Sequence, residues 1–352
     1  MNTEQNLEKK NSNRIIYLDV LNILACLSVI GLHVNYLAHR YEDTSLWRQC
    51  FAVEVLAYWA VPVFIMLSGA TLINYRSRYT TKSFFVHRFK KAIIPLVLWT
   101  IIFYCWKRFR GEMQWNGWQD FFNTLINFRV VTVYWFFAPL IMVYLAMPVL
   151  SKLVQEKKIL SYMFGIGFLF NSLLPFVSTL LLGGYNYDFT FQLASGYIML
   201  AVLGYLLHTT ELAVWTRILI YISGIVAACV RYFYTIHFSK IDGTINQFTW
   251  GYTNWIGVCL AAAVFVLVKY LCRFLSGEKY NIFGKAVTWM SSASFGIYLI
   301  HLFILDHLRA WFHFDGSEVV WRLLFPFVIY AVALVIVKCV QKIPYIGKML
   351  FP

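Results

Sequence analysis

Ten apolar stretches, most of them about 20 residues long, dominate the sequence and are separated by short polar segments. Runs of this length cross the ~30 Å hydrocarbon core of a membrane as α-helices. Lipid admits only helices and closed barrels, and barrel strands read as alternating segments of about ten residues, which this sequence lacks. The pattern therefore predicts an all-α, polytopic membrane protein. The predicted spans are 16–38, 53–73, 92–106, 133–151, 159–182, 193–207, 217–234, 255–275, 290–308 and 323–341.

The composition excludes the alternatives to a membrane protein. Hydrophobic residues make up 60% of the 352 residues and charged residues 13%, against about 25% charged residues in an average soluble domain. No soluble fold of this length could bury that much apolar surface, so soluble, disordered and fibrous proteins are excluded. The third and sixth spans are short, and we expect them to be tilted, broken or shielded by protein.

The distribution of basic residues predicts the orientation. The chain has 30 Lys and Arg residues against 16 Asp and Glu residues. Such an excess can indicate nucleic-acid binding, but basic residues also collect in the cytoplasmic loops of membrane proteins, and we therefore expect no nucleic-acid partner. With the N-terminus inside, 20 of the 30 basic residues fall in inner segments. We expect a cytoplasmic N-terminus (1–15), a transmembrane domain (16–341) and a cytoplasmic C-terminal tail (342–352).

The cysteines predict neither a disulfide framework nor a metal site. The chain has seven, none of them in a CxxC pair, and most lie inside apolar stretches. They are typical of small packing residues. The apolar run from Ile15 is long and contains charged residues, so we expect it to remain as a helix and not to be removed as a signal peptide.

The first span carries a polar stripe. Asp19, Asn22, Cys26 and His33 lie within it. At 100° per residue, the step from Asn22 to His33 leaves about 20° over full turns, and the step from Asp19 to His33 falls about 40° short, so all four share one face. The helical rise places Asn22 about 16 Å and Asp19 about 21 Å from His33. The stripe suits the wall of a cavity. Alternatively, Asp19 and Asn22 only anchor the inner end of the helix, and His33 meets lipid headgroups.

The second span contains a proline and a pair of small residues. Pro62 removes a backbone donor and should kink the helix, and Ser68-Gly69 permits another backbone to approach closely. Packing explains both features without a functional role. Glu54 lies at the outer edge of the predicted span, where an interfacial position would suffice.

A basic pair precedes the third span. Arg88 and Lys91 are three residues apart and share a helical face. Such a pair could hold a phosphate at the cytoplasmic surface. Equally, both residues could serve only as positive-inside anchors.

Two further groups of residues lie near the fourth and ninth spans. Tyr134 and Trp135 fit an aromatic belt at the outer interface. Tyr298 and His301 share one face of the ninth span, with His301 near the middle of the membrane. A buried histidine requires a partner, which could be a ligand, Tyr298 or a neighbouring helix.

Taken in order, these motifs resemble the acyltransferase-3 family of ten-helix membrane acyltransferases, from Leu18 to about Val340. Within the family, the chain looks most like the bacterial branch that O-acetylates surface polysaccharides, such as the enterobacterial common antigen acetyltransferase. The common pattern has Arg where this chain has Asn22 and Lys91, and His where it has Tyr134. The motifs that carry the resemblance are Leu18-Asp19-Val20-Leu21 with His33, Val61-Pro62-Val63-Phe64 through Ser68-Gly69, Arg88-x-x-Lys91 before Pro95, Tyr134-Trp135-Phe136 before Tyr144 and Pro148, and Ser294-Phe295-Gly296-Ile297-Tyr298-Leu299-Ile300-His301.

The resemblance implies an enzyme of the bacterial inner membrane that moves an acyl group, usually acetyl, from cytoplasmic acyl-CoA to a sugar hydroxyl. The acceptor would be a surface or exported glycan or a lipid-linked sugar, and acyl-CoA would be a co-substrate, with no bound cofactor or metal. The residues assigned are His33 and Asp19 for catalysis, Asn22, Ser68, Arg88 and Lys91 for donor binding, and Tyr134, Trp135, Tyr298 and His301 for the acceptor or cavity.

Acyl transfer to a hydroxyl requires a base or a nucleophile that carries the acyl group. Histidine suits either role because it changes charge near neutral pH, so we expect His33 to be the general base or a transient acyl carrier. Two other functions remain open from the sequence. The polar stripe could line the path of a transporter or flippase for a glycan or glycolipid. The chain could also be a non-catalytic subunit of a polysaccharide synthase.

Overall fold

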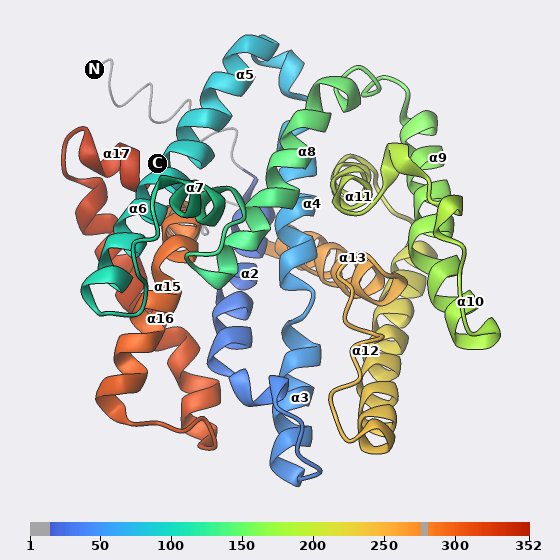
Figure 1. Cartoon of the computed structure of the whole chain (residues 1–352). Helices are drawn as coiled ribbons and strands as arrows, with labels where there is room; N and C mark the ends of the chain where they lie inside the picture. Colours follow the sequence, from blue (N-terminus) through green and yellow to red (C-terminus); the bar gives the residue numbers. More distant parts are fainter. Residues whose placement is uncertain (1–14, 276–280) are drawn as a thin grey trace.

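The structure, a computed structural model, describes residues 15–275 and 281–352. Most of the predicted cytoplasmic N-terminus (1–14) lies outside the described residues. Lys279, one of the basic residues counted in the inner segments, also lies outside them. Regular structure in the described part is helical throughout, as predicted (Figure 1). The α-helices are α2 (Ile16–Val34), α3 (Ser45–Ala57), α4 (Ala60–Leu72), α5 (Thr81–Arg88), α6 (Ile94–Phe109), α7 (Trp118–Ile126), α8 (Phe137–Leu150), α9 (Lys157–Phe168), α10 (Leu174–Leu182), α11 (Tyr197–Thr209), α12 (Val214–Asp242), α13 (Trp255–Leu271), α14 (Asn281–Ser291), α15 (Ser294–Phe312), α16 (Val319–Gln341) and α17 (Ile346–Leu350).

Nine helical segments of the described chain are long and apolar enough to cross a membrane, and α11 is a shorter apolar helix. An all-α polytopic membrane protein is therefore confirmed, whereas the side of the membrane on which the termini lie stays a prediction. The sixth predicted span, 193–207, corresponds to α11, whose 13 residues are mostly buried by neighbouring helices. Its shortness fits the expectation of shielding by protein, because a helix that does not face lipid need not match the thickness of the membrane.

The second span begins earlier than predicted. The helical segment runs from Ser45 as α3 and α4, with a break at Tyr58 and Trp59. The break begins at Tyr58, four residues before Pro62. In a regular helix the ring of a proline clashes with the carbonyl group of the residue four positions earlier. Residues 39–52, which connect the first two predicted spans, are therefore partly helical. The prediction that Glu54 lies at the edge of a span is wrong, because this residue is inside α3 and only 2% exposed.

Two π-helical turns lie in the third and fifth spans, each just ahead of a proline. The turn Phe89–Ile93 joins α5 to α6 ahead of Pro95, and the turn Leu169–Leu173 joins α9 to α10 ahead of Pro175. A π-turn widens the backbone and accommodates a proline that would disrupt a regular helix. The third span is consequently Thr81–Phe109 and much longer than the predicted 92–106.

Helices α4 and α11 cross at close range in the middle of the molecule (Figure 1). A Cβ added to Gly69 would lie 1.8 Å from the carbonyl oxygen of Ala201, and one added to Gly204 would lie 2.1 Å from that of Met66. No larger residue fits at either position without moving the backbone. The close approach predicted for Ser68-Gly69 is confirmed.

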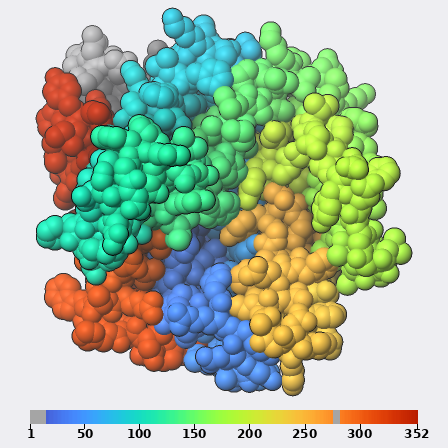
Figure 2. Space-filling model, viewed as in Figure 1, coloured from blue at the N-terminus to red at the C-terminus, as the bar shows by residue number. Residues whose placement is uncertain are grey.

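Helix α2 occupies the centre and packs against α4, α13, α14, α15 and α16. In Figure 2, α2 and α3 lie between the C-terminal helices on one side and the helices around α12 on the other. The predicted tail folds back onto α6, where Trp99 Nε1 donates to the carbonyl of Leu350 over 3.1 Å. Helix α2 therefore contacts both the C-terminal helices α14, α15 and α16 and the helices α4 and α13.

Candidate functional site

Hydroxyl groups of α14 fasten the N-terminal part of α2. Thr288 Oγ1 donates to Asp19 Oδ2 over 2.9 Å, and Ser291 Oγ donates to Asp19 Oδ1 over 2.7 Å. Asn22 Nδ2 lies 2.9 Å from Ser291 Oγ and 3.2 Å from its carbonyl oxygen. Asp19 is 8% exposed, and both of its oxygens are hydrogen-bonded. These contacts hold α2 and α14 in register.

His33, near the C-terminal end of α2, is half-buried and lies at the meeting point of two cavities. One, the large cavity, has a volume of about 620 Å³. The other, the small cavity, has a volume of about 80 Å³. The imidazole is therefore not sealed inside the helix packing, as a purely structural histidine would be. The large cavity is lined by residues that include His33, Tyr36, Trp106, Lys107, Asp306 and Arg309. The small cavity is lined by residues that include His33, His39, Glu54, Trp135, Tyr252 and Tyr298.

His301 of α15 faces His33, and the two ring centroids are 5.4 Å apart. Its Nδ1 donates a hydrogen bond to the carbonyl oxygen of Tyr298 over 2.7 Å. In the neutral ring this assignment leaves Nε2 as an acceptor, and Nε2 is buried without a hydrogen-bond partner among the described residues. An unpaired acceptor beside His33 can receive an N–H group of that ring or a hydroxyl of a ligand.

Two tyrosines join α15 to the 3₁₀ turn Thr132–Phe136. The hydroxyl of Tyr298 donates to the carbonyl of Val133, and that of Tyr134 donates to the carbonyl of Leu299 over 3.2 Å. Tyr134 is fully buried and lies behind the cavity walls, so it holds the wall in place. Trp135, in contrast, lines the small cavity and stacks on Tyr252 at 5.7 Å.

A third cavity, the middle cavity, has a volume of about 180 Å³ and continues the series toward the N-terminal end of α2. Asn22 and Ser68 both line it, so the fold brings these two predicted donor residues together. Three aromatic side chains line both the middle and the small cavity and form the partition between them: Phe64, Phe136 and Tyr298.

A fourth cavity, the Arg88 cavity, has a volume of about 500 Å³ and shares Tyr144 with the middle cavity. The Arg88 guanidinium lies 5.7 Å from the ring centroid of Tyr144. Lys90 also lines this cavity, whereas Lys91 is exposed and is not among its lining residues. The π-turn that begins at Phe89 changes the helical rotation between Arg88 and Lys91, so a regular helix was the wrong template for this pair.

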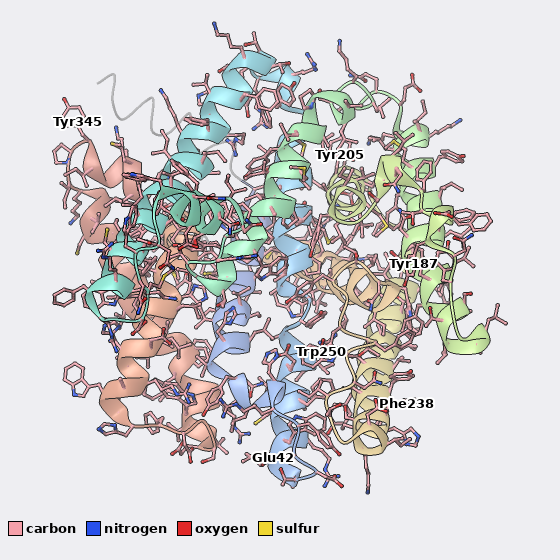
Figure 3. The ribbon with its side chains drawn as sticks, in the orientation of Figure 1. Glu42, Tyr187, Tyr205, Phe238, Trp250 and Tyr345 are labelled. Atoms are coloured by element: carbon pink, nitrogen blue, oxygen red, sulfur yellow. The ribbon has the colours of Figure 1, made fainter. Side chains whose placement is uncertain are left out.

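The sequence analysis missed a buried charged cluster beside the small cavity. Glu54 of α3 is 2% exposed and Arg231 of α12 is fully buried. Arg231 Nη2 lies 4.0 Å from Glu54 Oε1, and His39 Nε2 lies 3.7 Å from Glu54 Oε2. Trp250, labelled in Figure 3, lies against the Arg231 guanidinium at 5.1 Å. Two opposite charges in separate apolar stretches were the signal available in the sequence.

The predicted site is thus divided along α2. Asp19, Asn22 and Ser68 belong to the N-terminal end, and His33 and His301 belong to the C-terminal end. The Arg88 cavity and the middle cavity share Tyr144, and the middle cavity and the small cavity share Tyr298. The three cavities therefore lie in series between Arg88 and His33, and these shared side chains separate each cavity from the next.

The comparisons with known proteins bear on the whole chain. A family model described as an acyltransferase domain matches residues 15–340. The comparisons with curated proteins and with solved structures give no match.

Proposed function

The chain belongs to the acyltransferase family whose domain model covers residues 15–340, and from this premise we propose that it is an O-acetyltransferase of surface glycans. The donor would be acetyl-CoA on the cytoplasmic side of a bacterial inner membrane, and the acceptor a hydroxyl of a surface or exported glycan. The observation that carries the proposal is the position of His33, whose imidazole lines two cavities and faces a second histidine.

His33 would act on the acceptor hydroxyl. In the one-step form it takes the hydroxyl proton while the oxygen attacks the thioester carbonyl, the C–S bond breaks, and the departing CoA thiolate receives the proton. In the two-step form a nitrogen of His33 first carries the acetyl group and releases CoA, and the acceptor oxygen then displaces the nitrogen. The unpaired Nε2 of His301 would orient or share the proton of His33 in either form.

The donor would enter from the Arg88 cavity. A guanidinium is suited to CoA phosphates, and Arg88 lies at this end of the series, with the exposed Lys91 one turn away. Asn22 and Ser68 would contact the thioester end of the donor in the middle cavity. The partition of Phe64, Phe136 and Tyr298 then stands between the middle cavity and His33, so we expect only a narrow acyl arm to pass it.

The acceptor would occupy the large cavity. Its volume of about 620 Å³ falls within the usual range for small-molecule sites, roughly 300–1,000 Å³. Its lining carries both acidic and basic side chains, among them Lys107, Asp306 and Arg309, which suit a hydrophilic ligand. A hydroxyl presented from this cavity would reach His33, which lines the same cavity.

Membranes containing the protein should incorporate labelled acetyl groups from acetyl-CoA into their glycan fraction. His33→Ala should abolish incorporation at normal expression, and His237→Ala, an exposed histidine of α12, serves as the control that should retain it. Incorporation by His33→Ala at the wild-type rate would contradict the assignment. Glycan movement without label would support a transporter, and dependence of all activity on a co-purifying protein would support a non-catalytic subunit.

A further inference from the structure

Glu54 is a buried acid that the proposed reaction does not use. It lies on α3, which packs against α2 and α12, and its side chain is 3% exposed. A carboxylate in such a position is costly unless hydrogen bonds and an opposite charge stabilise it. Arg231 supplies the opposite charge.

Arg231 leaves part of the carboxylate without a partner. Its Nη1 donates to the carbonyl of Thr249 over 2.8 Å, and its guanidinium carbon lies 3.3 Å from the ring centroid of Tyr58. The 4.0 Å separation between Nη2 and Glu54 Oε1 is an ion pair beyond hydrogen-bond distance. Glu54 Oε2 is buried and has no hydrogen-bond partner among the described residues.

The unpaired oxygen belongs to a residue that lines the small cavity together with His33. The polar and aromatic groups around it are His39, at 3.7 Å from Oε2, and the rings of Trp135, Tyr252 and Tyr298. Burial and the charge of Arg231 lower the pKa of His39, which favours the neutral form of this ring. A donor group that enters the small cavity would supply the hydrogen bond that Glu54 Oε2 lacks among the described residues.

We propose that Glu54 binds the acceptor, by accepting a hydrogen bond from a second hydroxyl of the sugar whose neighbouring hydroxyl is acylated at His33. This inference rests on the proposed function. The ligand chemistry is a neutral polyol with two hydroxyls close together. Arg231 already balances the charge of Glu54, which disfavours an ammonium group as the donor.

The size of the cavity fits this assignment. A cavity of about 150 Å³ accommodates a benzene ring, so one of about 80 Å³ holds a hydroxymethyl arm or one edge of a sugar and excludes the whole ring. The ring itself would remain in the large cavity, on the other side of His33. Trp135 and Tyr252, which stack on each other, offer apolar ring surface to the C–H groups of the arm.

A kinetic experiment separates acceptor binding from support of Arg231. Purified wild type and variants are titrated with the unacetylated glycan prepared from cells that lack this protein and, separately, with labelled acetyl-CoA. Glu54→Asp keeps a charge for Arg231 but withdraws it from the cavity, and the double variant Glu54→Leu/Arg231→Gln removes the pair together and leaves no acceptor at position 54. Asp43→Asn, which removes an exposed acid that pairs with Arg48 and Lys240, is the matched control.

We expect both Glu54 variants to raise the KM for the glycan at least tenfold and to change the KM for acetyl-CoA less than twofold, with Asp43→Asn unchanged in both. A wild-type KM for the glycan in the folded double variant would overturn the inference, because Glu54 would then serve Arg231 alone. Equal increases in both KM values would also overturn it. Absence of transfer by the wild type would instead refute the proposed function, and the inference with it.

Discussion

The two ends of α2 differ in how their polar groups are satisfied. At the N-terminal end, both oxygens of Asp19 accept hydrogen bonds from α14, whereas Asn22 contacts Ser291 through Nδ2 and also lines the middle cavity. At the C-terminal end, His301 Nε2 and Glu54 Oε2 are buried without hydrogen-bond partners among the described residues, and His33 lines two cavities.

This difference separates polar groups that stabilise the fold from polar groups that can bind a ligand. A buried polar group whose hydrogen bonds are complete contributes to stability and has no capacity left for a ligand. A buried polar group that lacks a hydrogen-bond partner destabilises the protein when no ligand is bound. A ligand can supply the missing hydrogen bond. Both ends lie on one stripe of the helix, so burial and composition alone do not separate them. Their hydrogen-bond partners do.

Substitution at His301 is expected to have the largest effect on this comparison. His301→Leu removes the acceptor that faces His33 and should lower the rate of acetyl transfer about 100-fold, within the range for loss of an acid–base group. Stability to heat should fall little, since Nε2 was unpaired and the lost Nδ1 hydrogen bond was to a carbonyl of the same helix. The rate is measured with labelled acetyl-CoA and the Tm by fluorescence. A normal rate in His301→Leu would show that the unpaired nitrogen has no role in transfer.

The opposite pattern is expected at Asp19. Asp19→Asn weakens two charge-assisted hydrogen bonds from α14 and should lower the free energy of unfolding by about 1–2 kcal/mol. The rate per folded molecule should change less than tenfold, because Asp19 is about 21 Å along the helix from His33. Chemical denaturation and single-turnover transfer test the two parts. A fully folded but inactive Asp19→Asn protein would restore Asp19 to the catalytic group.

A smaller effect is expected from His39, which lies outside the spans and 3.7 Å from Glu54. Its folded-state pKa is lowered, chiefly by burial and then by Arg231, so the unfolded chain binds the proton more readily. The neutral ring therefore stabilises the fold above about pH 6.5, and this contribution is lost as the pH falls below it.

The measurement is the decrease in Tm between pH 7.5 and pH 5.5. His39→Gln, which does not titrate, should show a smaller decrease than the wild type. An identical pH dependence in the two proteins would mean that His39 has the same affinity for protons in the folded and unfolded chain.

The sequence predicted the fold well where a local signal was decisive. Length and hydropathy located the spans, Pro62 predicted a kink in the second span, where the helix breaks at Tyr58 and Trp59, and Gly69 predicted a close helix crossing. Boundaries failed where charge interrupted an apolar run. Arg88 and Lys91 lie within the long third helical segment, and Glu54 lies inside the second. A charge can be accommodated inside a helical segment when protein or a cavity, and not lipid, surrounds it.

The sequence by itself determined that this chain is a helical membrane protein and that Asp19, Asn22 and His33 share one face of its first span, because helical rotation and hydrophobicity are local properties. Only the tertiary structure decided that His33 faces His301 and that Glu54 pairs with Arg231. It also decided that the carboxylate of Asp19 accepts hydrogen bonds from α14. Those partners are far apart along the chain, and their contacts depend on how whole helices pack. The capacity of each polar group for a ligand is therefore fixed by the fold.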